Sequence, residues 1–535
     1  MKKISIFIRE SIIIRSLVLY AIIIVICCTG CGKKQEVSFA GDNNEDSSDT
    51  GETAVIQDEQ SILYQKADGS LASDTEKALK DGRNDKNTVV WIMPYIGVEV
   101  FTTERLNMFN QMIRDEKKDF QLEICYVYDD GEESYDKQLS SLIEQGYGDI
   151  CNTGYTYTAK NLENYGKMKK EGYFRNLTED LKTGNGKKIR EAYSDYVWKS
   201  VTEKGEIYTI PNQYFMPHRG YLGFSKKYFK KDIIQKYDDS LYNLSKYLTK
   251  TMKKKLGKKS MIWGLSYYDT LNSLGIYELF GVWGNQETGD FHSAYSDKNY
   301  KKILQMLHRM HKEKNLHQIS DLENVTNIEK IIKKGDFGIA VVPDNIDMEL
   351  LKKNAYVVEL PYYYKGDYDQ GNALIQKSKK WEKAMELYGV LISSKKDANC
   401  LVYGKENVDF LLKNGFAYEI ETGEDLPARF IKQNLGIADQ AYNSRTDYFG
   451  KDVSKSKKEY FKGNKFHESY FNGFIPDYTK IKQKKNDQRY EDSFNVWRED
   501  DFKEKYKELQ SYFEKKQKAT ISQLNEQVGE WKNGD

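Results

Sequence analysis

Aromatic side chains that stand close to polar side chains are the residues of this sequence best suited to recognise a small molecule. An aromatic ring offers a flat apolar face, while amide, hydroxyl, carboxylate or guanidinium groups can hydrogen-bond the edge of a bound solute. A sugar, with flat C–H faces and a rim of hydroxyls, fits this combination. The predicted ligand-binding residues are Tyr95, Thr153, Tyr155, Gln213, Tyr214, Arg219, Trp263, Tyr268, Trp283 and Asn345.

Tyr214 and Trp283 are the two leading candidates in this set. Tyr214 follows Pro211 in a segment expected to connect two parts of the protein, and the glycines on both sides of Val282-Trp283 allow an exposed ring. The alternative for any single ring is a half-buried structural position, because the chain holds 41 tyrosines. Trp91 and Trp198 are expected in the core.

Metal and catalytic motifs are weak in this sequence. His308, His311 and His317 could form a metal cluster, but histidines at i and i+3 among Lys and Arg are typical of the solvated face of a helix. No metal or cofactor is therefore predicted. The sequence contains no G-x-S-x-G elbow and no P-loop, and the chain is predicted not to be an enzyme. Carboxylate pairs leave a glycoside hydrolase open as a second class of function.

The first thirty residues have the composition of an export leader. Basic residues precede an apolar run over 17–26, which is shorter than the roughly twenty residues that a spanning helix needs. The run leads to Cys28-Thr-Gly-Cys31-Gly32, which resembles the bacterial lipobox, although a C-x-x-C pair can also indicate redox or metal chemistry. The resemblance implies a lipoprotein signal peptide over 1–30 and lipidation of Cys31. Residues 31–87 are expected to form a flexible polar tether.

Length, cysteine content and charge limit the class of protein. About five hundred residues follow the leader, more than one hydrophobic core usually organises, so two lobes are expected. The cysteines after the leader, Cys125, Cys151 and Cys400, are too few and too scattered for a disulfide framework. With 82 Lys and Arg against 81 Asp and Glu and no long basic block, nucleic acid is not an expected partner.

Strand and helix patterns alternate in the first part of the body. This order is typical of a parallel α/β lobe, in which ligands bind beyond the carboxyl ends of the strands. Tyr95 and the turn over 152–155 are candidates for that reason. The predicted elements are a strand over 88–95, a helix over 99–117, a strand over 120–127, a helix over 134–145 and a strand over 148–154.

The chain is then predicted to cross to a second lobe and to return near 362–372. A hairpin over 198–214 is expected to leave the first lobe. The second lobe should contain strands over 220–225, 337–342 and 355–360 and helices over 241–255, 269–280 and 297–313. The predicted domains are lobe 1 over 88–213, lobe 2 over 214–365, and a return to lobe 1 with a helical C-terminal region over 366–535.

Six segments within about 88–531 carry a resemblance to a known family. They are Asp149-Ile-Cys-Asn-Thr-Gly154, Trp198 to Pro211, Tyr221-Leu-Gly-Phe-Ser-Lys-Lys-Tyr-Phe229, Gly371 to Leu387, Leu401-Val-Tyr-Gly-Lys-Glu-Asn-Val-Asp-Phe410 and Ile521 to Trp531. Their order resembles the family 1 extracellular solute-binding proteins of bacterial ABC importers, particularly the large lipoproteins of Gram-positive bacteria. Ser225 departs from the family's usual Asn, and Asn372 stands where an apolar residue is common.

The resemblance implies an α/β fold of the periplasmic-binding-protein (Venus flytrap) type, with two α/β lobes joined by crossing strands and C-terminal helices packed across them. It implies a monomer at the outer face of the cell membrane that captures a small polar solute, foremost an oligosaccharide, and delivers it to ABC permease subunits by closing. A ligand sensor of the same fold that presents its closed form to a membrane receptor is the alternative.

Overall fold

The computed structural model describes most of the chain from Ile62 to Gly534. The described ranges are 62–95, 102–128, 134–153, 159–211, 219–279, 281–318, 325–343, 346–366, 371–413, 415–423, 435–436, 461–462, 465–477, 480–481 and 494–534. The predicted signal peptide and Cys31 lie outside them.

The first lobe is built on a six-stranded sheet of order β1-β3-β2-β4-β17-β7. The strands β3, β2 and β4 are parallel, β1 and β17 pair antiparallel with β3 and β4, and β7 pairs antiparallel with β17. The bounds are β1 Ile62–Gln65, β2 Thr88–Tyr95, β3 Gln121–Tyr128, β4 Ile150–Asn152, β7 Ile210–Pro211 and β17 Gly371–Leu374.

Helices cover this first sheet because their apolar faces need the sheet for burial. On α3, for example, Leu106, Phe109 and Ile113 are buried at helical spacing. The helices are α2 (Thr75–Asn84), α3 (Thr103–Asp115), α4 (Ser134–Glu144), α5 (Ala159–Lys170), η1 (Asp180–Lys182), α6 (Gly184–Ala192), α7 (Asp195–Val201), α14 (Trp381–Ser393) and α15 (Lys395–Tyr403).

The second lobe is built on a five-stranded sheet of order β13-β9-β14-β8-β15. The strands β13, β9 and β14 are parallel, whereas β8 runs antiparallel to both β14 and β15. The elements are β8 (Gly220–Ser225), α8 (Ile233–Lys236), η2 (Leu241–Tyr247), α9 (Lys250–Leu256), η3 (Gly257–Ser260), β9 (Met261–Trp263), α10 (Tyr267–Ser273), α11 (Lys298–Lys312), β13 (Leu316–Gln318), α12 (Val325–Lys333), β14 (Ile339–Pro343), α13 (Met348–Asn354) and β15 (Ala355–Glu359).

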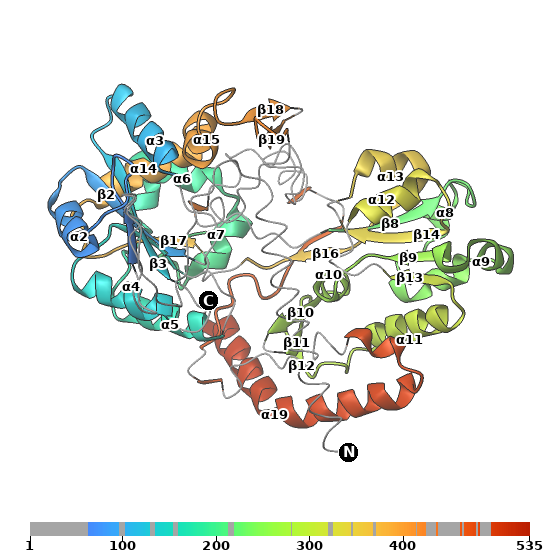
Figure 1. The fold of residues 1–535 in the computed structure, drawn as a ribbon. Helices are drawn as coiled ribbons and strands as arrows, with labels where there is room; N and C mark the ends of the chain where they lie inside the picture. Colours follow the sequence, from blue (N-terminus) through green and yellow to red (C-terminus); the bar gives the residue numbers. More distant parts are fainter. Residues whose placement is uncertain are drawn as a thin grey trace, which may run out of the picture.

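A three-stranded sheet and the C-terminal helix connect the two lobes. The strands β10 (Ile276–Leu279), β11 (Val282–Asn285) and β12 (Phe291–His292) bury Leu279 and Phe291 in the core of the first lobe and Ile276 in that of the second. Helix α19 (Phe502–Gly534) runs beneath both lobes (Figure 1). The other elements are β5 (Thr202–Glu203), β6 (Glu206–Ile207), β16 (Tyr362–Tyr364), β18 (Leu411–Lys413), β19 (Phe416–Tyr418), β20 (Phe466–Glu468) and η5 (Asn495–Arg498).

The predicted fold class is confirmed, since two sheets with parallel strands and covering helices are joined by crossing segments and followed by a helical C-terminal region. Three local predictions are wrong. The tether does not extend to residue 87, because β1 and α2 belong to the first lobe, and Trp198 lies in helix α7, before the β5–β6 hairpin. The expected helix over 269–280 ends at Ser273, because Gly275 adopts a positive φ of 70° and β10 follows. The predicted helical stretch over 241–255 is present as two elements, η2 and α9.

Candidate functional site

The carboxyl edge of the first sheet brings together the ends of β2 and β4 and the start of β17. Tyr95 ends β2, and Thr153 follows β4 directly. The backbone N–H and the hydroxyl of Thr153 donate to the carbonyl of Gly371 at 2.9 and 3.3 Å. The Thr153 side chain is buried and holds the return strand in place, so its hydroxyl is already engaged in the structure.

The ring of Tyr95 is half-buried at this edge and packs edge-on against Tyr126, with ring centroids 6.3 Å apart. Burial raises the pKa of the Tyr95 hydroxyl, with a smaller contribution from Tyr128. A protonated hydroxyl can both donate and accept a hydrogen bond. Tyr95 therefore combines an accessible aromatic surface with a polar group at the edge where α/β sheets bind ligands.

The carboxyl edge of the second sheet carries an ion pair. Gly220, the first residue of β8, pairs with Pro343 at the end of β14, so Arg219 lies at this edge. Its Nη1 is 3.5 Å from Oε1 of Glu359, the last residue of β15, and the two side chains are 19% and 24% exposed. A partly exposed guanidinium–carboxylate pair can exchange some of its contacts for the hydroxyls of a neutral solute.

Tyr268 lies close to the same edge, on the helix that follows β9. Helix α10 begins with a capping box, in which Ser266 and Asp269 bind each other's backbone N–H groups. Tyr268 is 48% exposed and packs edge-on against the buried Tyr267, with centroids 5.1 Å apart. The structure thus presents the Tyr268 ring to solvent, whereas the neighbouring Asp269 caps the helix.

The two crossings begin and end at these carboxyl edges. The outward crossing joins Pro211, which is paired with Gly371 in the first sheet, to Gly220 in the second. The return crossing joins Glu359 to Gly371. Nine residues span at most about 30 Å, so the two edges lie near each other rather than at opposite ends of the molecule. Tyr95 belongs to the edge of the first sheet, and Arg219, Glu359 and Tyr268 belong to the edge of the second.

A third connection runs beside the return crossing and was not predicted. Strand β20 pairs in parallel with β16, which lies in the crossing. From this segment Glu468 reaches Lys199 of the first lobe at 2.7 Å, and the Tyr470 N–H donates to the Gln286 carbonyl, beyond β11, at 2.7 Å. The only sequence signal for it is the density of aromatic residues over 461–474.

Two of the predicted ligand-binding rings are core residues. Trp263 and Trp283 are both 0% exposed, so the prediction of an exposed ring at Trp283 is wrong. Trp283 packs against Tyr295 and Tyr300, and its Nε1 donates to the Tyr267 hydroxyl at 3.1 Å. The neighbouring Gly284 makes room for the Phe471 ring, which lies 2.6 Å from where a Cβ would stand. Trp91 and Trp198 are buried, as predicted.

The remaining predicted ligand-binding residues lie outside the described residues. These are Tyr155, Gln213, Tyr214 and Asn345. Of the predicted ligand-binding residues, Tyr95, Thr153, Arg219 and Tyr268 lie at or near the carboxyl edges. The structure also places Glu359, which was not predicted, at the edge of the second sheet.

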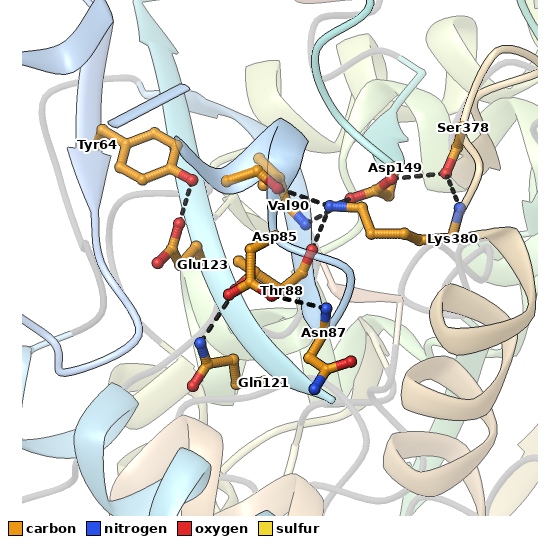
Figure 2. Close-up of polar contacts among 11 residues, drawn as sticks. Tyr64, Asp85, Asn87, Thr88, Val90, Gln121, Glu123, Asp149, Ser378 and Lys380 are labelled. Carbon is orange, nitrogen blue, oxygen red and sulfur yellow. Dashed lines mark hydrogen bonds and ion pairs between the residues drawn. The ribbon is translucent and has the colours of Figure 1, made fainter. Parts of the chain in front are cut away.

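A buried polar network fastens the opposite edge of the first sheet (Figure 2). The Lys380 ammonium lies 3.0 Å from Oδ2 of Asp149, with the side chains 10% and 4% exposed. Asp149 also accepts from the Val90 N–H at 2.9 Å and from the Ser378 hydroxyl at 2.6 Å. Lys380 donates in addition to the carbonyls of Gly82 and Thr88. The network lies at the amino ends of β2 and β4 and acts structurally.

Histidine and cysteine side chains have packing roles where they are described. His308 and His311 contact the C-terminal region rather than facing only solvent: His308 stacks on Phe502 with centroids 5.0 Å apart, and His311 meets Trp497 edge-on at 5.2 Å. Among the described residues no cluster of His, Cys, Asp and Glu could hold a metal. Cys125, Cys151 and Cys400 are free and buried. No helix in the described part of the chain is long and apolar enough to cross a membrane.

The chain is similar to several solved structures of solute-binding proteins. The N-glycan transport solute binding protein (NgtS) from Streptococcus pneumoniae is 17% identical over 83% of this chain and 99% of that chain, with a TM-score of 0.48. The ABC-transporter substrate binding protein FusA from Streptococcus pneumoniae, in complex with kestose, is 12% identical over 84% and 100%, with a TM-score of 0.48. The HMO binding ABC-transporter associated solute binding protein from Bifidobacterium longum infantis is 15% identical over 84% and 99%, also with a TM-score of 0.48.

No family model matches the chain, and no curated protein matches it. Each TM-score lies below 0.5, so the fold assignment rests on the strand order and the crossings of this chain and not on these similarities.

Proposed function

We infer that the protein is an extracytoplasmic solute-binding protein that captures a small polar solute, foremost an oligosaccharide, and delivers it to an ABC importer. The observation that carries this inference is that both crossings run between the carboxyl edges of the two sheets. A solute held between the edges touches both lobes, and only such a solute can stabilise a closed arrangement over an open one.

The side chains at the two edges suit a neutral, hydroxyl-rich ligand. Tyr95 and Tyr268 offer partly accessible rings from different lobes. Arg219 is paired with Glu359, and this pair carries no net charge and supplies both donors and acceptors. This combination of stacking surfaces and paired polar groups supports carbohydrate as the ligand class.

The first experiment is a ligand screen by thermal unfolding. The chain from Gly32 onward, which retains every described residue, is heated with oligosaccharides, monosaccharides, polyols and peptides. A ligand bound only by the folded state raises the midpoint, and about 2.7 kcal/mol of stabilisation is expected at one hundred times the dissociation constant. A saturable shift with an oligosaccharide, recovered chemically unchanged, is the expected result. Cleavage of the sugar would indicate the glycoside hydrolase, and no shift across the panel would contradict the carbohydrate assignment.

Variants at the two edges test where the ligand binds. Tyr95→Ala and Tyr268→Ala should each weaken binding up to about tenfold, because each removes a stacking contact of roughly 0.5–1.5 kcal/mol. Tyr512→Ala on α19, a half-buried tyrosine away from both edges, is the matched control and should leave affinity unchanged. Equal effects of all three variants would place the ligand elsewhere.

The lipid anchor and the location at the outer face of the membrane are part of the same proposal. They rest on the lipobox-like sequence that ends at Cys31. Metabolic labelling with a radioactive fatty acid should mark the wild-type chain in the membrane fraction, and Cys31→Ser should abolish the label. Cells lacking the gene should lose uptake of the ligand identified in the screen, and normal uptake would contradict delivery to an importer.

A further inference from the structure

The near-neutral total charge of the chain conceals a difference in charge between its two lobes. The first lobe, residues 62–211 and 371–403, contains 27 Lys and Arg against 29 Asp and Glu, whereas residues 220–360 of the second lobe contain 23 Lys and Arg against 17 Asp and Glu. The net charge is therefore −2 for the first lobe and +6 for the second. This uneven distribution of charge gives the molecule an electric dipole, which orients it relative to charged partners.

The positive charge of the second lobe is concentrated at the amino edge of its sheet, opposite the carboxyl edge. At this edge, two lysines precede or follow each of the five strands. The pairs are Lys226 and Lys227 after β8, Lys258 and Lys259 before β9, Lys312 and Lys314 before β13, Lys333 and Lys334 before β14, and Lys352 and Lys353 before β15. We call these ten residues the lysine edge.

The lysine edge is exposed and poorly neutralised. All ten side chains are exposed. Among the described residues only two of them form ion pairs, Lys227 with Asp336 at 2.7 Å and Lys312 with Asp500. Helix α9 adds the exposed Lys254 and Lys255 and lies at the end of the second lobe remote from the first (Figure 1). The described carboxylates thus leave most of this positive charge facing solvent.

Helix ends alone do not account for this pattern. Helices that alternate with parallel strands place their C-terminal ends at the amino edge, where cations are favoured. The same geometry holds in the first lobe, but there acidic residues outnumber basic ones. The helix ends and loops before β2, β3 and β4 contain Asp85, Lys86, Glu116, Lys117, Lys118, Asp119, Glu144 and Asp149, whereas the corresponding segments of the second lobe contain Glu313 and Asp336 beside ten lysines. The excess of lysine is therefore a property of the second lobe and not of the architecture.

We propose that the lysine edge binds the surface of an anionic membrane through the phosphate groups of its lipids. Five neighbouring strands span about 19 Å, so the lysine pairs are spread over a width that many headgroups share rather than converging on one small anion. Each lysine near an anionic surface strengthens binding about fivefold, and the interaction is screened by salt. The contact is independent of the captured solute and leaves both carboxyl edges free.

Vesicle co-sedimentation tests this proposal directly. The chain from Gly32 onward, which lacks Cys31, is mixed with vesicles of phosphatidylcholine alone or with 30% phosphatidylglycerol. We expect binding only to the vesicles with phosphatidylglycerol, and at least a tenfold loss when salt is raised from roughly 50 to 500 mM. The quadruple variant Lys254→Gln, Lys255→Gln, Lys258→Gln and Lys259→Gln should bind at least 100-fold more weakly.

A matched variant in the first lobe is the control. Replacing the exposed Lys167, Lys170, Lys182 and Lys187 by Gln removes the same charge and should change binding less than threefold. A second variant on other loops, with Lys333, Lys334, Lys352 and Lys353 replaced by Gln, should repeat the loss if the first one folds poorly. Equal losses in both lobes, equal binding to neutral vesicles, or binding to soluble polyphosphate without binding to vesicles would each overturn the proposal.

Discussion

Asp149 joins three segments of the first lobe that are far apart in the sequence. Its carboxylate accepts from the Val90 N–H at the start of the sheet and from Ser378, and it neutralises Lys380 just before α14. A buried charge that loses its partner is costly because water cannot replace the lost interaction. This carboxylate therefore adds to the strand pairing of β17 in fixing the returning chain to the first lobe.

Asp149→Asn should lower the free energy of unfolding by about 3 kcal/mol, because Lys380 would stay buried without a negative partner. Urea unfolding monitored by tryptophan fluorescence gives the value. Lys187→Gln, which breaks the exposed pair with Glu191 at 3.8 Å, is the control and should change stability little. A small loss in Asp149→Asn would mean that the carbonyls of Gly82 and Thr88 suffice to hold Lys380.

Glu123 should make stability depend on pH. Burial raises the pKa of its carboxyl, Asp85 raises it further, and the hydrogen bonds from Tyr64 and the Ala67 N–H and the charge of Lys380 oppose the shift. The folded chain thus holds this proton more tightly than the unfolded chain does. Stability from this group is present below the unfolded pKa of about 4.3 and is lost as pH rises through the folded pKa.

Glu123→Gln removes that titration, so the variant should gain stability relative to the wild type between pH 4 and pH 7. Denaturant unfolding of both chains at several pH values isolates the difference from all other titrating groups. Parallel pH profiles would contradict a raised pKa for Glu123.

The environments of individual side chains were the hardest feature of this protein to predict from the sequence. Asn372 departs from the family pattern, yet its Oδ1 accepts from Trp91 Nε1 at 3.1 Å, which satisfies a buried donor 281 positions away. Trp283 was expected to be exposed because glycines flank it, whereas Gly284 is needed for the approach of Phe471. In both cases the deciding neighbour comes from a distant part of the chain, and local sequence carries no sign of it.

Helix α19 is fastened to the three-stranded sheet by a buried amide. Gln517 is 0% exposed; its Nε2 donates to the Gly281 carbonyl at 2.7 Å, and its Oε1 accepts from the Ser293 hydroxyl and the Ala294 N–H, each at 3.1 Å. All of these bonds join the helix to loops beside β11 and β12. The element that passes beneath both lobes is thus attached near its middle.

Gln517→Ala should destabilise the protein by about 2–3 kcal/mol, since it leaves buried donors and an acceptor without partners. Gln510→Ala, at a partly exposed position of the same helix where the side chain donates to Glu514, provides the comparison and should have a small effect. Guanidinium unfolding measures both. A loss equal to that of Gln510→Ala would show that water replaces the three bonds.

Whole elements were predicted well where one periodicity dominates. Strand β2 has the predicted bounds Thr88–Tyr95 and strand β8 the predicted bounds Gly220–Ser225, because continuous apolar runs end at turn residues. The helix over 297–313 is confirmed within one residue at each end. The alternation of strands and helices predicted where the strands end, and so pointed to Tyr95 at the carboxyl edge. The β16–β20 connection depends on pairing between distant segments, which local sequence patterns do not show.

At the scale of the whole molecule, ligand binding should make the protein more compact. The crossings join the two carboxyl edges, and a solute that contacts both lobes favours their approach. Small-angle X-ray scattering should show a smaller radius of gyration with the ligand found in the thermal screen. Tyr268→Ala, measured without ligand, should scatter like the free wild type. Saturable binding with an unchanged radius would contradict capture by closure.

The buried thiols make this motion accessible to spectroscopy. From residue 32 onward the only cysteines are Cys125, Cys151 and Cys400. All three are buried, and burial raises the pKa of Cys400 to about 11 and those of the other two further. A thiol that is both inaccessible and protonated reacts slowly with maleimides at neutral pH. Fluorophores on Lys187→Cys and Lys254→Cys, one on each lobe, can therefore report the distance between the lobes while all three native cysteines stay in place.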